Sequence, residues 1–100
     1  MDINQLTEKM NEFVTSKGWY SPSSPKPQTP RNLAISLSLE ANEVLEHYQW
    51  NESSVNKEEL ASELADVALY LLQLSSITDI DLEKAILEKL EKNYMRKWNQ

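Results

Sequence analysis

Two pairs of acidic residues are the part of this 100-residue sequence best suited to chemistry. Glu40 and Glu43 are three residues apart, and so are Glu63 and Asp66. On a helix this spacing places both side chains of a pair on one face, with Cβ atoms ~5–6 Å apart. Both pairs lie in apolar sequence, LSLEA and LADVAL. Packed together, two such charges ~4 Å apart would repel by roughly 4 kcal/mol, so protons or a cation must neutralise them.

A cluster made only of carboxylates is typical of a site for a hard divalent cation, Mg²⁺ or Mn²⁺. A carboxylate-bridged di-iron centre needs Glu-x-x-His pairs, and the single histidine, His47, has Val44 three residues before it. We therefore exclude the di-iron site and expect a structural or interface role for His47. The alternative for the four acids is a pair of ordinary solvated helix faces, because acidic residues at this spacing are common.

Helices must position these acids, because the chain has a single glycine and its β-branched residues are scattered. Gly18 ends the first predicted helix, and residues 19–30, which hold all four prolines, form a loop that opens with two aromatic residues. The Val67–Leu74 stretch is apolar on nearly all sides and is expected to be buried on several of them. The apolar spacing predicts an all-α bundle of four helices, in one domain over residues 1–100: Asp2 to Lys17, Thr29–Pro30 to about Trp50, Asn56 to about Ser76, and Asp81 through Tyr94.

Composition limits the environment and the partners of this domain. The net charge of −6 argues against a surface that follows nucleic-acid phosphates. The sequence has no cysteine, which fits a reducing compartment. We expect no signal peptide and no segment that spans a membrane, since charged or polar residues interrupt the apolar stretches. From these observations we expect a soluble, cytoplasmic domain.

The ordered motifs Glu40-Ala-Asn-Glu43 and Glu63-Leu-Ala-Asp66 resemble the ExxE…ExxD signature of the MazG-like all-α nucleotide pyrophosphohydrolases, closest to the dCTP pyrophosphatase branch. The similarity runs through nearly the whole chain. Further segments carry it in the same order: Glu12-Phe13, Trp19, Pro30-Arg31-Asn32-Leu33, Glu46, Gln49-Trp50, Tyr70, Asp81-Leu82, Lys89, Asn93 and Arg96.

This resemblance implies Mg²⁺-dependent hydrolysis of a (deoxy)nucleoside triphosphate, such as dCTP or a related dNTP, to a monophosphate and pyrophosphate. Such an enzyme would sanitise the nucleotide pool. The four acids would be the catalytic metal ligands, with Glu40 or Glu43 also open as the group that accepts a proton from water. The resemblance places other residues on the substrate: Trp19, Trp50 and Tyr70 at the base, and Lys89, Asn93 and Arg96 at the phosphates and sugar. Core packing, for the aromatics, and a solvated helix end, for the cations, are the alternatives.

Three positions depart from the family pattern. His47 stands where relatives tend to have an apolar residue, Asn11 where the dCTP-specific branch has a substrate-binding His, and Leu39 where many members have a further Glu. We place Trp98 at an interface or at the C-terminus.

The expected assembly is a homo-oligomer, a dimer or a dimer of dimers, in which Trp19 of one subunit serves the metal site of another. Two functions are alternatives to the pyrophosphohydrolase. The first is a non-catalytic helical adaptor or regulatory domain of the same fold, and the second is an antitoxin-like or stress-regulator role.

Overall fold

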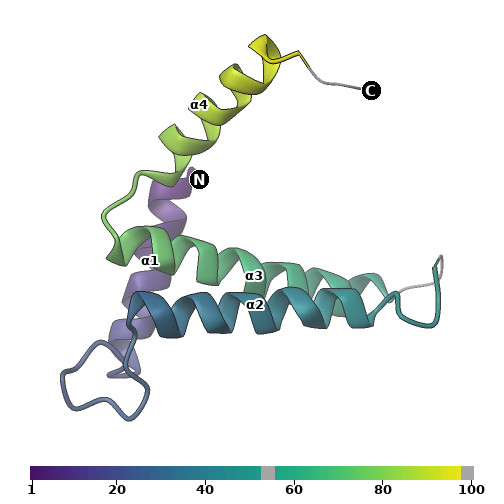
Figure 1. The fold of residues 1–100 in the computed structure, drawn as a ribbon. Helices are drawn as coiled ribbons and strands as arrows, with labels where there is room; N and C mark the ends of the chain where they lie inside the picture. Colours follow the sequence, from purple (N-terminus) through teal and green to yellow (C-terminus); the bar gives the residue numbers. More distant parts are fainter. Residues whose placement is uncertain (53–55, 98–100) are drawn as a thin grey trace.

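The computed structural model describes residues 1–52 and 56–97. These residues form four helices and no strand, namely α1 (Ile3–Ser16), α2 (Pro30–Glu46), α3 (Lys57–Ile77) and α4 (Leu82–Met95) (Figure 1). The all-α prediction is therefore confirmed. Trp98 lies outside the described residues.

The helices begin where the sequence places their caps. Asp2 and Gln5 form a capping box, in which each side chain accepts a hydrogen bond from the other residue's backbone N–H. The side chains of the other three caps also accept hydrogen bonds from first-turn backbone N–H groups: Thr29, Asn56 and Asp81. Gly18 follows the first helix at φ +73°, a conformation that favours glycine.

The second helix is shorter than predicted, because it ends at Glu46 and not near Trp50. Beyond this point the backbone N–H groups bond three residues back instead of four, from His47 to Val44 and from Tyr48 to Leu45. This tighter pattern turns the chain out of the helix. The turn carries Trp50 onto the surface, where the residue is 89% exposed.

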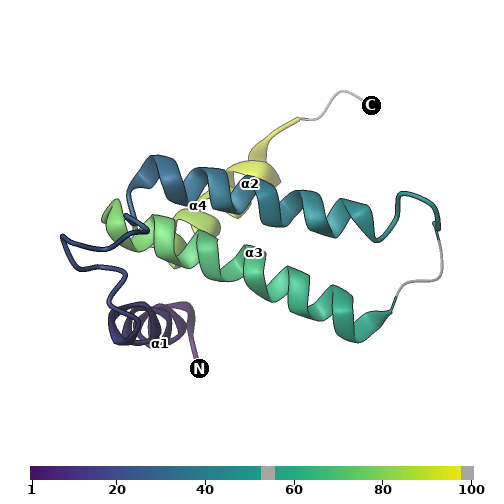
Figure 2. The ribbon, with the colours of Figure 1, turned by 90° about the horizontal axis from the view of Figure 1, so that it is seen from below.

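The antiparallel helices α2 and α3 lie side by side, and α1 crosses α3 at a steep angle (Figures 1 and 2). Met10 and Val14 of α1 pack with Leu72 of α3 in the buried core. A short chain of hydrogen bonds joins the same elements, since the Tyr20 hydroxyl donates to the Asn11 side chain, which donates to Ser76.

The helices do not close into a four-helix bundle within one chain. Figure 1 shows α4 projecting away from the α2–α3 pair, and the radius of gyration is 16.2 Å, against about 13 Å for a compact 100-residue domain. The prediction for the Val67–Leu74 stretch is wrong within this chain, because Leu69 and Leu71 are 45% and 43% exposed. The two residues lie on different faces of α3, and Leu69 lines a cavity with residues of α1.

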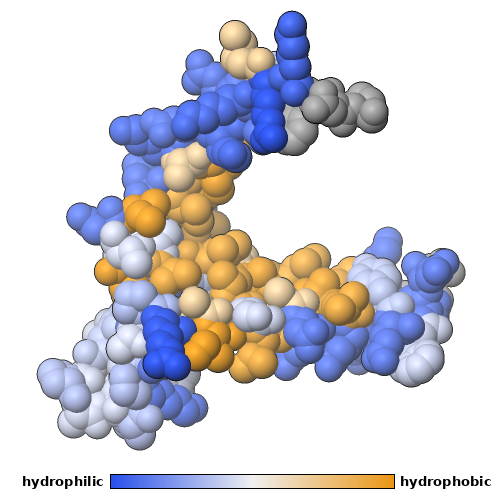
Figure 3. Space-filling view, viewed as in Figure 1, coloured by the Kyte–Doolittle hydropathy of each residue, from blue (hydrophilic) through white to orange (hydrophobic). Residues whose placement is uncertain are grey.

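Among the described residues, one helix, α3, has the length and composition that could cross a membrane. The sequence predicts no such segment. The core helix of a soluble protein meets the same criteria, although only 17% of the apolar window of α3 is buried here. In Figure 3 the apolar surface on this side of the molecule lies over the α2–α3 pair and at the base of α4.

Candidate metal centre and adjoining pocket

Two helical stripes face each other in the seam between α2 and α3. On α2, Glu40, Glu43 and His47 follow at spacings of three and four residues. On α3, Glu63 and Asp66 begin a second stripe that continues through Tyr70 and Gln73. Because residues three or four apart share a helix face, the antiparallel pairing aligns the two sets of acids.

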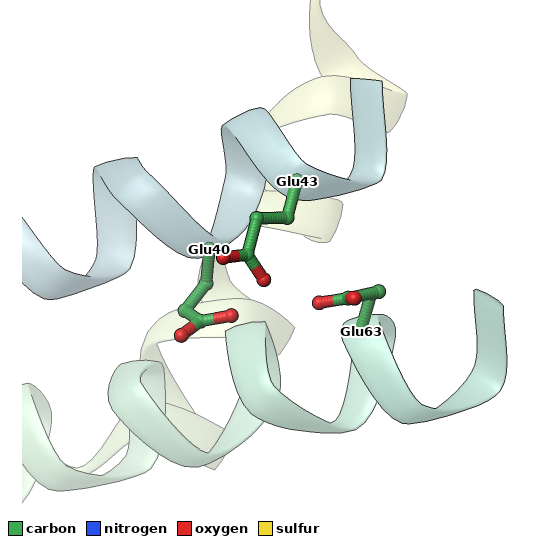
Figure 4. Close-up of side chains that lie close together, drawn as sticks. All are labelled: Glu40, Glu43 and Glu63. Carbon is green, nitrogen blue, oxygen red and sulfur yellow. The ribbon is translucent and has the colours of Figure 1, made fainter. Parts of the chain in front are cut away.

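The structure brings three of the four predicted ligands together. Carboxylate oxygens of Glu40, Glu43 and Glu63 all lie within 4.8 Å of one another, and the three side chains converge in Figure 4. Oε2 of Glu40 and Oε2 of Glu63 are buried, with no hydrogen-bond partner among the described residues. Unpaired buried carboxylate oxygens are costly. They are the donors that a divalent cation requires, so this group fits a metal ion.

Burial, hydrogen bonding and repulsion raise the pKa of two of these acids. For Glu40, burial is the largest cause, followed by hydrogen bonding to Glu43 and by repulsion from Glu43, Asp66 and Glu63. For Glu63, hydrogen bonding to Glu43 comes first, then burial and repulsion, and nearby His47 lowers the pKa. Both shifts show that the metal-free cluster favours bound protons over unpaired charge.

Asp66 lies between this cluster and an apolar pocket. Its charge acts on Glu40 and Glu63, yet its oxygens are not part of the three-carboxylate group. It also lines a cavity of about 440 Å³ together with the following residues: Leu6, Lys9, Met10, Phe13, Val14, Trp19, Leu69, Tyr70 and Gln73. The fourth predicted ligand is thus the link between the acids and a pocket of ligand size.

Two of the predicted base-binding aromatics, Trp19 and Tyr70, line this pocket. The Trp19 ring packs edge to face on Phe13, with centroids 5.7 Å apart. Trp19 and Tyr70 also line a second cavity of about 410 Å³ beneath the proline loop. Within one chain, Trp19 and Tyr70 share a cavity with Asp66 and not with the three clustered acids.

The structure does not bring the other predicted substrate residues to the site. Trp50 lies on the surface turn after α2, and it lines neither the two cavities beside Trp19 nor the pocket at Glu43. Lys89, Asn93 and Arg96 lie on or just after α4, which projects away from the acids (Figure 1). Arg96 lines a separate surface pocket with neighbours from its own helix.

Sequence reasoning missed several residues that shape this region. Gln73 is buried and donates from Nε2 to Oε1 of Gln28, at 2.6 Å, which fastens the proline loop to α3. Gln73 follows Asp66 by seven residues, which is two helical turns, so the spacing alone places it on the same face of α3. Asn11 uses its amide on Tyr20 and Ser76, so this departure from the family has a structural role here.

His47 lies beside the acids, with Nε2 4.0 Å from Oε1 of Glu63. It also lines a pocket with Glu43, Glu46 and Glu63. The sequence favours a structural or interface role for His47, with an extension of the carboxylate stripe as the alternative, and this contact places the residue at the end of that stripe.

Comparison with known proteins agrees with this geometry. The model of the MazG-like family matches residues 35–99. Proteins named dCTP pyrophosphatase 1 from Rattus norvegicus and Homo sapiens are 29% and 31% identical over 94 residues, which cover 85% of this chain and 52% of each relative. The chain thus spans about half the length of the curated relatives it matches.

A solved structure, that of a pyrophosphatase from Archaeoglobus fulgidus, has the same fold. It is 39% identical, with a TM-score of 0.76 over 90% of this chain and 86% of that chain. The family match covers well over half of the sequence, including both acidic pairs. The chain belongs to the MazG-like family.

Proposed function

We propose that this protein is a divalent-metal-dependent nucleoside triphosphate pyrophosphohydrolase, acting on dCTP or a related dNTP in the nucleotide pool of the cytoplasm. The observation that carries the proposal is the three-carboxylate group, with two unpaired buried oxygens, next to an aromatic pocket. The names of the relatives, dCTP pyrophosphatase 1 and a pyrophosphatase, support this substrate class and reaction.

Mg²⁺, or Mn²⁺ in its place, fits the donor set because all three clustered ligands are carboxylates. Glu40, Glu43 and Glu63 would hold the ion, and Asp66 stands close enough to add its charge. When bound, the ion would neutralise phosphate charge and lower the pKa of a water molecule.

The protein's own part in the reaction is positioning and proton transfer. A water molecule adds to a phosphorus of the α–β bridge, the bridging P–O bond breaks, and a monophosphate and pyrophosphate leave. A carboxylate that is not fully engaged by the ion would accept the proton of the attacking water, and Glu40 and Glu43 are the two candidates. Trp19 and Tyr70 would hold the base in the pocket beyond Asp66.

A second copy of the chain completes the molecule in this proposal. The accessible surface is 8115 Å², whereas a compact monomer of this mass exposes about 5,800 Å². The excess of roughly 2,300 Å² has the size of a stable subunit interface. A homodimer or dimer of dimers would cover the apolar surface of α3 and α4. It could also bring Lys89, Asn93 and Arg96 of one copy towards the substrate of another.

The test is a panel of the four dNTPs with Mg²⁺, with pyrophosphate release as the readout. We expect turnover of at least one dNTP and a fall of at least about 10²-fold in the Glu63→Gln variant, which removes a ligand charge. Glu58→Gln, the same change on an exposed residue of another face of α3, should keep normal activity.

Retained turnover in Glu63→Gln would refute the ligand assignment. A folded wild-type protein that releases no pyrophosphate from any dNTP, with either Mg²⁺ or Mn²⁺, would instead favour the helical adaptor.

A further inference from the structure

We propose that Gln73 selects the base of the substrate, because its side-chain oxygen accepts a hydrogen bond from an exocyclic amino group such as that of cytosine or adenine. The inference rests on the proposed function and deepens it, since it names a specificity-determining residue and a chemical feature of the preferred dNTPs.

Gln73 lies in the wall that the two aromatic cavities share. Trp19, Tyr70 and Gln73 line both the cavity of about 440 Å³ beside Asp66 and the cavity of about 410 Å³ beneath the proline loop. Gln73 itself is only 4% exposed. A base that stacks on either aromatic residue therefore has this buried amide in the same wall, whichever of the two cavities holds it.

Hydrogen bonds of the proline loop fix the direction in which the Gln73 amide points. Nε2 of Gln28 donates to the backbone carbonyl of Lys26 at 2.6 Å, and a carbonyl can only accept. Oε1 of Gln28 therefore turns towards Gln73, where it accepts from Nε2 at 2.6 Å. The nitrogen of the Gln73 amide thus faces the loop, and its oxygen is turned away from Gln28.

The second proton of Nε2 of Gln73 is engaged as well. Burial raises the pKa of Tyr20, and hydrogen bonding from Gln73 lowers it, as expected of a donor next to the hydroxyl. The Tyr20 hydroxyl donates its own proton to Oδ1 of Asn11 at 2.6 Å, so its oxygen is the atom that accepts from Gln73. The Gln73 amide therefore has an acceptor, and no donor, to offer a ligand.

This acceptor, Oε1 of Gln73, is the unsatisfied group of the network. It accepts no hydrogen bond from any described residue, and the fully buried unpaired side-chain oxygens are those of Glu40 and Glu63. Oε1 is therefore not sealed inside the protein, and a ligand in the cavities lined by Gln73 can reach it. An unpaired oxygen on a nearly buried amide is unfavourable until a donor pairs with it.

An acceptor in the wall distinguishes bases by their exocyclic groups. Cytosine and adenine carry an amino group, which donates, where uracil, thymine, hypoxanthine and guanine carry a carbonyl oxygen, which accepts. The amino group would satisfy Oε1 of Gln73, whereas the carbonyl would place two acceptors against each other. A site with a buried hydrogen-bonding group rejects the analogue that leaves this group unpaired. We therefore expect a preference for amino-bearing bases over keto bases of the same ring size.

The test compares matched substrates, dCTP with dUTP and dATP with dITP, through the ratio of kcat/KM within each pair. Ring size and overall activity cancel in this ratio. The wild type should prefer the amino member at least about tenfold in each pair that it hydrolyses. Gln73→Met, which has a similar length but no amide, should reduce the preference to less than about twofold.

Gln28→Met separates recognition of the base from attachment of the loop. It removes the same loop contact as Gln73→Met but keeps Oε1 of Gln73 and the hydrogen bond to Tyr20. The ratios should therefore stay at the wild-type values even if overall activity falls. Titration calorimetry of the wild type with dCMP and dUMP tests the inference without turnover and without a Gln73 variant, and dCMP should bind more tightly.

The outcomes separate this inference from the proposed function. Hydrolysis without a preference for the amino member, or a preference that survives in a Gln73→Met variant with wild-type circular dichroism, overturns the role of Gln73 and leaves the pyrophosphohydrolase standing. Equal affinities for dCMP and dUMP do the same. A wild type that hydrolyses none of the dNTPs overturns the proposed function itself.

Discussion

At the scale of single residues, the acids of the α2–α3 seam set the energetics of the site. Glu40 and Glu63 each bury an oxygen that lacks a hydrogen-bond partner among the residues described. The pKa of Glu40 is raised chiefly by burial and that of Glu63 chiefly by hydrogen bonding to Glu43, with repulsion within the cluster adding to both. Such an arrangement is unfavourable for folding when the acids are charged and unpaired. We infer that the site is kept for binding and not for stability.

The raised pKa values predict an unusual pH dependence of stability without metal. Between the ordinary glutamate pKa and the raised ones, the folded protein binds more protons than the unfolded chain, through Glu40 and Glu63. The contribution of these two acids is therefore fully present at low pH and is lost as pH rises through the raised values. In EDTA, Tm should be higher at about pH 5 than at about pH 7.

Metal ions should reverse this loss. At about 100 times its Kd, an ion that binds only the folded state adds about 2.7 kcal/mol to the free energy of unfolding. Calorimetric scans with and without Mg²⁺ at about pH 7 measure this gain. Glu63→Gln should flatten the pH profile and reduce the gain. A Tm profile in EDTA that is the same in wild type and Glu63→Gln would contradict the coupling.

At the scale of elements, the proline loop and α3 together build the pocket. The loop cannot form a helix because of its prolines, and the Gln28–Gln73 hydrogen bond holds it against α3. Trp19 stands at the start of this loop, over the stripe of α3 that begins at Glu63. The pocket therefore depends on a loop fixed by a few contacts to a rigid helix.

This arrangement predicts that Trp19 contributes to binding more than to chemistry. Stacking of a base on an aromatic ring is worth about 1–3 kcal/mol, so Trp19→Ala should raise KM for the preferred dNTP by roughly 5–150-fold. The kcat should change much less. Trp19→Phe keeps an aromatic face and should recover most of the affinity. Steady-state kinetics of the three proteins give the answer, and an unchanged KM in Trp19→Ala would remove Trp19 from the base site.

At the scale of the whole molecule, the chain leaves too much apolar surface uncovered for a lone subunit. Four hydrophobic residues are buried among those described, while α3 exposes Leu64, Leu69 and Leu71, and α4 exposes Ile86, Leu87 and Leu90. In Figure 3 the hydrophobic surface extends along the α2–α3 pair and up to the base of α4. Several large apolar residues exposed on neighbouring helices are typical of an interaction surface.

We expect the wild type to form a dimer or tetramer at micromolar concentration, measured by size-exclusion chromatography with light scattering. Leu64 is 50% exposed on α3, and Leu64→Glu would place a charge in the interface, which should shift the protein to smaller species. Thr15→Glu adds the same charge on an exposed site of α1 and should not change the mass. A wild type that elutes as a monomer would contradict the assembly.

The sequence by itself determined the helices and their starts. The caps Asp2, Thr29, Asn56 and Asp81 act through bonds to residues two or three positions away, so local pattern is sufficient to find them. The same holds for the two acidic pairs, because helical spacing alone places each pair on one face. The family also follows from these motifs and their order.

Only the tertiary structure decided which residues meet. The angle between α2 and α3 brings Glu40, Glu43 and Glu63 together and sets Asp66 towards the pocket. The early end of α2 carries Trp50 outwards, and the direction of α4 keeps Lys89 away from the acids of its own chain. Packing between elements far apart in sequence fixes these relations, and no local pattern of residues encodes the angle at which two helices cross.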